Sequence, residues 1–157
     1  RDIEQEIVPI CQRKGIGIIT WGPLAGGFLT GKYQPGERSK EGTRSDEGWV
    51  FPSRFFAANA DDSLKVLLQV ADEVGRSPAQ VALRWIVQQP FITSAIIGAR
   101  TLRHAEDNLR ASTWQLPADA LQRLNEVSYL PPRYPLAMEA NMHERRNAAV
   151  NMPSLKE

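Results

Sequence analysis

The sequence has little cysteine, almost no net charge and no long apolar run. Its 157 residues include one cysteine, Cys11, so no internal disulfide can form and a reducing, cytoplasmic location is expected. Lysine and arginine number 19 against 18 acidic residues, a formal net charge of +1. This balance argues against charge-driven binding to nucleic acid or a membrane surface. No signal peptide is recognisable, and no apolar stretch approaches the roughly 20 residues that span a bilayer.

Hydrophobic periodicity predicts an alternation of helices and short strands. Helices are expected over 2–14, 63–74, from 78 to the stop at Pro90, 102–111 and 117–127, and strands over 16–21 and 92–97. This order predicts an α/β fold with parallel strands. Two parallel strands cannot by themselves form a sheet that is covered on both faces. The alternation fits residues 1–129, and residues 130–157 are interpreted as a C-terminal extension.

Local signals specify several details of these helices. Ser77 is predicted to cap a helix that starts at Pro78, with Gln80 completing a capping box. Thr101 is predicted to cap the next helix, whose inward face would carry the apolar residues Leu102, Ala105 and Leu109. Cys11 is expected in the core, and the pair at 61–62 is interpreted as a helix N-terminal cap pair rather than a metal site. The long segment 34–56 ends in aromatic residues and is expected to fold over something.

Two strand ends could hold a ligand, because ligands of βα proteins bind at the carboxyl ends of the strands. The first, residues 21–27, joins an aromatic side chain to a glycine-rich turn, which is also consistent with an ordinary turn. The second, residues 98–101, opens a helix beside Arg100 and Arg103, which suits a phosphate. The alternative is that both arginines are solvated surface residues. His104 lies on the same turn. The sequence shows no nucleophile–base pair and no metal-ligand spacing.

Four segments together resemble the C-terminal half of an aldo-keto reductase. They are WGPLAGGFLTGKY (21–33), EGTR (41–44), SPAQVALRW (77–85) and IIGARTLRHAEDNL (96–109). The resemblance implies the last part of a (β/α)₈ TIM barrel, strands seven and eight with their helices, incomplete in this chain. It also implies an oxidoreductase that uses NADP(H) to reduce aldehydes or ketones, with a small carbonyl compound as substrate.

The resemblance assigns cofactor contacts residue by residue. An aromatic at Trp21 would stack on the nicotinamide, and Arg44 would help to clamp the cofactor. The pyrophosphate loop would comprise Gly22, Pro23, Leu24, Ala25, Gly26, Gly27, Thr30 and Lys32. The 2′-phosphate site would comprise Gly98, Arg100 and His104, and the adenine would contact Asp107 and Asn108.

Several positions depart from the family pattern. Gly22 replaces a common Ser, Ile97 a common Pro and Asp107 a common Glu, while His104 replaces Gln or Arg and would make phosphate affinity pH-dependent. The family's catalytic Asp, Tyr, Lys and His belong to the first half of the barrel, and none of the three tyrosines lies in a matching motif. This chain alone is therefore expected to be inactive.

Three alternatives remain. The chain could belong to an enzyme, to a regulatory subunit such as a potassium-channel β-subunit, or to a free-standing half-barrel that pairs as a homodimer. A complete barrel needs about 250 residues, so the chain is expected to be the latter part of a larger domain that pairs with an N-terminal half. For the substrate rim we expect residues 49–56 and the tail after Tyr129.

Overall fold

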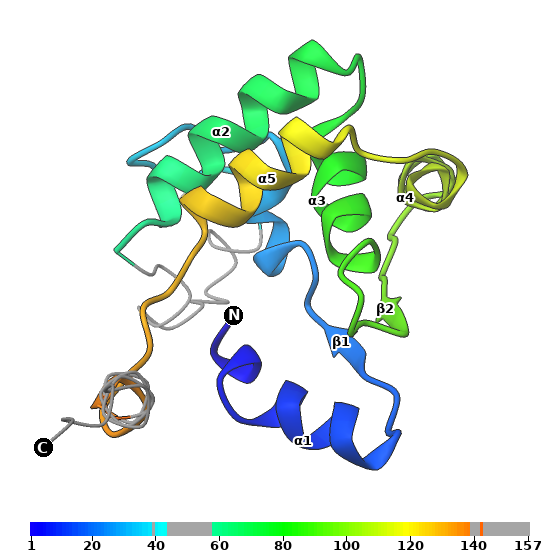
Figure 1. Ribbon diagram of the computed structural model, residues 1–157. Helices are drawn as coiled ribbons and strands as arrows, with labels where there is room; N and C mark the ends of the chain where they lie inside the picture. The colour runs from blue at the N-terminus through cyan, green and yellow to red at the C-terminus, as the bar shows by residue number, and fades with distance from the viewer. Residues whose placement is uncertain (39, 44–57, 139–141, 143–157) are drawn as a thin grey trace, which may run out of the picture.

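The computed structural model describes residues 1–38, 40–43, 58–138 and 142. Its elements, in chain order, are η1 (Asp2–Glu4), α1 (Ile7–Lys14), β1 (Ile19–Trp21), η2 (Ala25–Thr30), α2 (Ala60–Glu73), α3 (Pro78–Val87), β2 (Ser94–Ile96), α4 (Leu102–Leu109), η4 (Arg110–Thr113) and α5 (Ala118–Val127), where η denotes a 3₁₀ helix. Helices α2 and α5 lie side by side, α3 lies between them and the strands, and α4 packs against α3 (Figure 1).

The two strands pair in parallel, as the order of elements predicted. Ile19 lies opposite Ser94, and Trp21 lies opposite Ile96. Just before the paired residues, the Ile18 N–H donates to Thr93 Oγ1 at 3.0 Å, and the Thr93 N–H donates to the Ile18 carbonyl at 2.9 Å. This reciprocal pair holds the start of the two strands together.

The strands are shorter and more exposed than predicted. Each has three residues, because a strand extends only as far as its partner can hydrogen-bond to it, and the predicted ranges 16–21 and 92–97 ignored that limit. Residues 16–21 are apolar on both faces, which predicts a buried parallel strand, and this prediction is wrong for this chain. Ile19 is 62% exposed, Trp21 68% and Ile96 53%.

The core lies among the helices and not on the sheet. Leu64 and Val70 of α2 and Val81 of α3 are fully buried. Leu124 of α5 and Phe28 of η2 pack into the same cluster. Removing such side chains from water supplies roughly 1.5–3 kcal/mol each, so the helices and η2 provide most of the stabilising burial.

Helix α1 corrects the prediction of one helix over 2–14. The chain forms η1 first and starts α1 at Ile7, which places Pro9 in the first turn, where its missing N–H costs nothing. Val8 is the buried residue of α1. Cys11 is only partly buried and is not the core residue that was expected.

The predicted N-cap residues of α3 and α4 are confirmed. Ser77 Oγ accepts from the Gln80 N–H at 3.2 Å, and Thr101 Oγ1 accepts from the His104 N–H at 3.2 Å. The inward face predicted for α4 is wrong, since Leu102 is 76% exposed and Leu109 60%. Helix α4 instead buries Asn108, which lies on a different stripe of the helix.

No helix among the described residues is long and apolar enough to cross a membrane. Within the same residues, no three His, Cys, Asp or Glu side chains come together as they would around a metal ion.

Candidate functional site

The two predicted strand-end motifs meet at one edge of the sheet. Because β1 and β2 are parallel and Trp21 pairs with Ile96, their carboxyl ends lie next to each other. The chain leaves one strand into the loop 22–27 and the other into the turn 98–101. This is the edge at which βα folds bind ligands.

The loop after β1 is wound tightly and borders open space. The Ala25 N–H donates to the Gly22 carbonyl at 2.9 Å, and Thr30 Oγ1 donates to the Gly27 carbonyl at 2.7 Å. A Cβ built on Gly22 or Gly27 would meet no atom within 4 Å. The backbone at these glycines is therefore accessible to a ligand. Lys32, just after the loop, has an exposed side chain.

The turn after β2 is joined to α4. Asn108 is 7% exposed and donates from Nδ2 to the Gly98 carbonyl at 3.4 Å. A Cβ on Gly98 would meet no atom within 4 Å, so this turn also borders open space. Arg100, Arg103 and His104 are exposed. The two guanidinium groups and the imidazole lie beside the N-terminus of α4, whose partial positive charge favours an anion.

Asp107 connects α4 to the start of α3. Ser77 Oγ donates to Asp107 Oδ2 at 2.7 Å, and Gln80 Nε2 donates to Asp107 Oδ1 at 2.6 Å. The Gln80 side chain thus contacts Asp107 instead of completing the predicted capping box. This link could not be predicted from the sequence, because Ser77 and Gln80 lie 30 and 27 positions before Asp107 and no local pattern joins residues so far apart.

Asp61 ties the loop beyond η2 to the start of α2. It pairs with Arg38 at 2.6 Å and accepts from the Gly36 N–H at 2.9 Å. The Arg38 guanidinium, with the Gly36 N–H, lowers the pKa of Asp61 to about 2. The predicted cap pair is corrected: the N-cap residue is Asn59, and both acidic residues lie in the first turn. Favourable interaction with the helix dipole explains their position.

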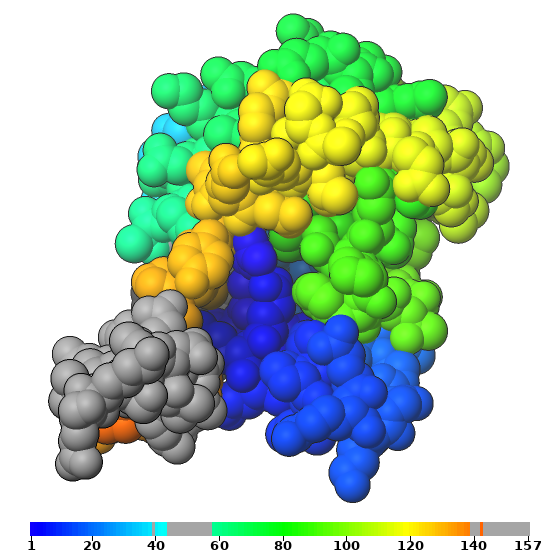
Figure 2. Space-filling model, in the orientation of Figure 1, coloured from blue at the N-terminus to red at the C-terminus, as the bar shows by residue number. Residues whose placement is uncertain are grey.

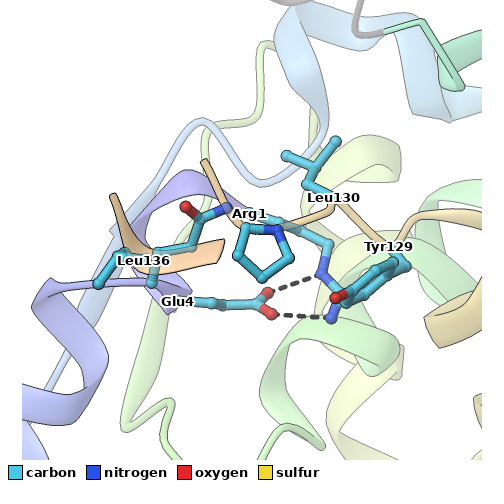
Figure 3. A pocket seen from close by; sticks show the side chains of 7 residues that line it. Arg1, Glu4, Tyr129, Leu130 and Leu136 are labelled. Carbon is cyan, nitrogen blue, oxygen red and sulfur yellow. Dashed lines mark hydrogen bonds and ion pairs between the residues drawn. The ribbon is translucent and has the colours of Figure 1, made fainter. Parts of the chain in front are cut away.

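A hollow lies where the N-terminal segment meets the tail. It has a volume of about 300 Å³ and is lined by Arg1, Glu4, Gln5, Tyr129, Leu130, Pro132 and Leu136 (Figure 3). Figure 2 shows the first residues, in dark blue, below α5 and beside the start of the tail. Arg1 donates to both carboxylate oxygens of Glu4, at 2.8 and 2.7 Å.

Arg1 also binds the end of α5, since Nη1 donates to the Asn125 carbonyl at 2.7 Å and to Ser128 Oγ at 2.9 Å. Its guanidinium carbon lies 5.6 Å from the Trp85 ring centroid, a cation–π geometry. Arg133 forms an ion pair with Asp2 at 2.9 Å. The Arg1 guanidinium therefore joins the N-terminal segment to the end of α5. The ion pair between Asp2 and Arg133 also holds the start of the tail against the N-terminal segment.

Two predicted site elements lie outside the described residues. They are Arg44 and the aromatic segment 49–56. The three tyrosines are described. Tyr33 is 5% exposed and donates its hydroxyl to Thr43 Oγ1 at 2.9 Å, whereas Tyr129 and Tyr134 are exposed by 55% and 79%.

Comparisons with known proteins agree on the family. The sequence model of the Aldo/keto reductase family matches residues 1–128. An uncharacterized oxidoreductase of Bacillus subtilis is 34% identical over 133 residues, which cover 81% of this chain and 36% of that protein. A probable voltage-gated potassium channel subunit beta of Arabidopsis thaliana is 36% identical over 115 residues, covering 69% of this chain and 34% of that protein.

The L-glyceraldehyde 3-phosphate reductase of Escherichia coli is 36% identical over 105 residues, which cover 64% of this chain and 30% of that protein. The chain thus spans about a third of the length of the curated relatives it matches. The match over 128 residues covers both strand ends and the helices from η1 to α5. The chain belongs to the aldo/keto reductase family.

Proposed function

We propose that this chain carries the NADP(H)-binding part of an aldo-keto reductase that reduces aldehydes or ketones to alcohols. The observation that carries the proposal is the pairing of Trp21 with Ile96, which puts two loops with ligand-binding chemistry at one sheet edge. In this proposal β1 and β2 are strands seven and eight of a (β/α)₈ barrel. Two observations support the view that further strands cover Trp21 and Ile96. Both side chains are exposed in this chain, and the chain matches only part of the length of its relatives.

The residues at the strand ends fit a dinucleotide. Open space beside Gly22, Gly27 and Gly98 leaves room for a pyrophosphate close to the backbone. Trp21, with 68% of its surface exposed at the strand end, offers a flat face for the nicotinamide. When bound, NADPH would supply the hydride that reduces the carbonyl carbon. The chain's own groups would orient the ring and exclude water from one side of it.

The preference for the phosphorylated cofactor rests on the start of α4. A 2′-phosphate needs cationic donors, and a guanidinium binds phosphate through two parallel hydrogen bonds. Arg100 is the proposed donor, beside the Gly98 turn and the helix N-terminus capped by Thr101. His104, exposed on the same turn, would add a second contact.

The proton donor is proposed to lie outside this chain's described residues. The Tyr33 hydroxyl is buried against Thr43, and Tyr129 lines the hollow at the tail. Neither belongs to the strand-end loops. This chain would therefore supply cofactor binding and, through the tail after Tyr129, part of the substrate rim.

Titration of NADPH into the intact natural protein tests the proposal. Binding is measured by isothermal titration calorimetry, with NADH as the comparison. We expect NADPH to bind below millimolar concentration and more tightly than NADH. If neither cofactor binds in that range, the cofactor assignment is wrong.

A regulatory subunit on the same fold is the second candidate, favoured by the similarity to the Arabidopsis potassium channel subunit. Both candidates predict cofactor binding, so binding does not separate them. Steady-state reduction of a generic aldehyde by the intact natural protein does. Turnover supports the reductase, whereas NADPH binding without turnover supports the subunit.

A further inference from the structure

We propose that Ser77 and Gln80, at the start of α3, are positioning residues that hold the Asp107 carboxylate for recognition of the adenine amino group. This inference rests on the proposed function and on the adenine contact that the family resemblance implies for Asp107. It adds two residues from a different helix, joined to Asp107 by hydrogen bonds in the structure and not by proximity in sequence.

The first part of the argument is that both carboxylate oxygens are held. Ser77 Oγ donates to Oδ2 at 2.7 Å and Gln80 Nε2 donates to Oδ1 at 2.6 Å. Two donors on two oxygens fix both the position of Asp107 and the plane of its carboxylate. Because an ionised carboxylate has about four acceptor sites, two remain for other donors. Asp107 is only partly buried, so one side of it faces solvent.

Ser77 is itself fixed by its second role. Its hydroxyl oxygen accepts from the Gln80 N–H at 3.2 Å, so the hydroxyl proton is left to point at Asp107. The Ser77 hydroxyl accepts the hydrogen bond that caps the helix and donates the hydrogen bond to Asp107, so the two contacts do not compete. The donor to Asp107 is therefore already oriented before any ligand binds.

Gln80 makes the contact with Asp107 while leaving its own side-chain oxygen without a hydrogen bond to any residue that the structure describes. Its side chain belongs to a residue 4% exposed, and its Oε1 atom is buried with no hydrogen-bond partner among the described residues. An unsatisfied buried acceptor is unfavourable. The amide is oriented so that Nε2 reaches Asp107, although this orientation leaves Oε1 without a partner among the described residues. A leucine of similar size would fill the site without that loss.

The fixed carboxylate has a defined selectivity. A carboxylate accepts hydrogen bonds and does not donate them, so it attracts the amino group of adenine and repels the carbonyl oxygen that hypoxanthine carries at the same position. A carboxylate free to rotate or withdraw would discriminate less, because it could turn away from the wrong base.

The experiment compares NADPH with deamino-NADPH, its hypoxanthine analogue, by isothermal titration calorimetry on the intact natural protein. The variants are Ser77→Ala, which removes one donor, and Gln80→Leu, which removes the other while keeping the buried volume. Ser77→Thr keeps the hydroxyl and serves as the conservative rescue. The matched control is Gln88→Leu in the C-terminal cap of α3, where the amide bonds the Leu116 backbone at 3.1 and 3.0 Å, away from Asp107.

We expect the wild type to prefer NADPH over the analogue. That preference should fall about three- to tenfold in Ser77→Ala and in Gln80→Leu, because Asp107 then keeps only one of the two donors that hold it. Ser77→Thr and Gln88→Leu should keep it. A thermal melt of each variant measures its stability separately from nucleotide preference. Gln80→Leu should lower the melting temperature little.

Five outcomes overturn the inference. A wild type that binds both nucleotides equally excludes recognition of the amino group. An unchanged preference in both donor variants, or an equal loss of affinity for both nucleotides, means that Ser77 and Gln80 have a structural role alone. A preference that falls as far in Gln88→Leu as in Gln80→Leu means the same. Failure of the wild type to bind NADPH at all overturns the proposed function together with this inference.

Discussion

Replacing Gly31 by alanine tests how tightly the strand-end loop is packed against α3. Gly31 ends η2 with a φ of 81°, a conformation that costs a residue with a side chain about 1–2 kcal/mol. An added Cβ would also lie 2.8 Å from Cγ of Pro78, the first residue of α3. The proline ring is tied to the backbone and cannot rotate away. Overpacking of this kind adds about 1–3 kcal/mol.

The two contributions can be separated with a second glycine. Gly36 has a φ of 90°, and a Cβ there would meet no atom within 4 Å. Gly36→Ala should therefore cost only the backbone part, about 1–2 kcal/mol. Gly31→Ala should exceed it by about 1–3 kcal/mol, the overpacking part. The free energy of unfolding is measured by urea denaturation of the intact natural protein, followed by circular dichroism.

A Pro78→Ala background completes the test. Without the ring, the excess cost of Gly31→Ala over Gly36→Ala should disappear, which a double-mutant cycle reports as coupling between residues 31 and 78. Equal destabilisation by the two glycine substitutions would refute the reasoning. So would an excess that persists when the ring is gone, because the contact with Pro78 would then not be its source.

Three further changes have defined outcomes. Leu64→Ala, at a side chain with 0% exposure, should lower the free energy of unfolding by about 2–5 kcal/mol in urea denaturation, and a loss below 1 kcal/mol would contradict its place in the core. Arg100→Ala should weaken NADPH binding by about 1–3 kcal/mol and NADH binding little; equal losses in titration calorimetry would remove the 2′-phosphate assignment. Arg38 and the Gly36 N–H lower the pKa of Asp61 to about 2 from 3.8, so the pair stabilises the fold above pH 3.8 and ceases to do so as the pH falls through about 2. Asp61→Asn should therefore melt below the wild type at pH 7, and this gap should close between pH 4 and pH 2; a gap that persists at pH 2 would point to another cause.

Local chemistry made part of the fold predictable. Ser77 and Thr101 could be identified as helix caps because a cap involves neighbours three residues away, and both caps are present. The parallel pairing of the strands followed from the alternation of elements. The family, too, could be identified from the order of four motifs, and it is borne out by the match over residues 1–128.

Properties that depend on distant partners were not predictable. The pattern of Leu102 and Leu109 marks an apolar stripe, but it does not say which stripe α3 and η4 meet, and α4 packs through Asn108 instead. The bonds from Ser77 and Gln80 to Asp107 join two helices across about thirty residues, so no window of sequence contains them. The partners of Asp61 escaped for the same reason, since Arg38 precedes it by 23 positions.

The reciprocal hydrogen bonds between Ile18 and Thr93 affect the opposite end of the strands. Because each strand has only three paired residues, few other backbone hydrogen bonds keep β1 from sliding along β2. A slip of one position would move one loop by about 3.3 Å against the other and turn Trp21 to the opposite face. A Cβ at Gly17 would lie 2.8 Å from Thr93 Oγ1, so bulk there would force the pair apart. The Ile18–Thr93 pair, at the end of the sheet farthest from the two loops, therefore adds to the three paired residues in fixing the distance between those loops.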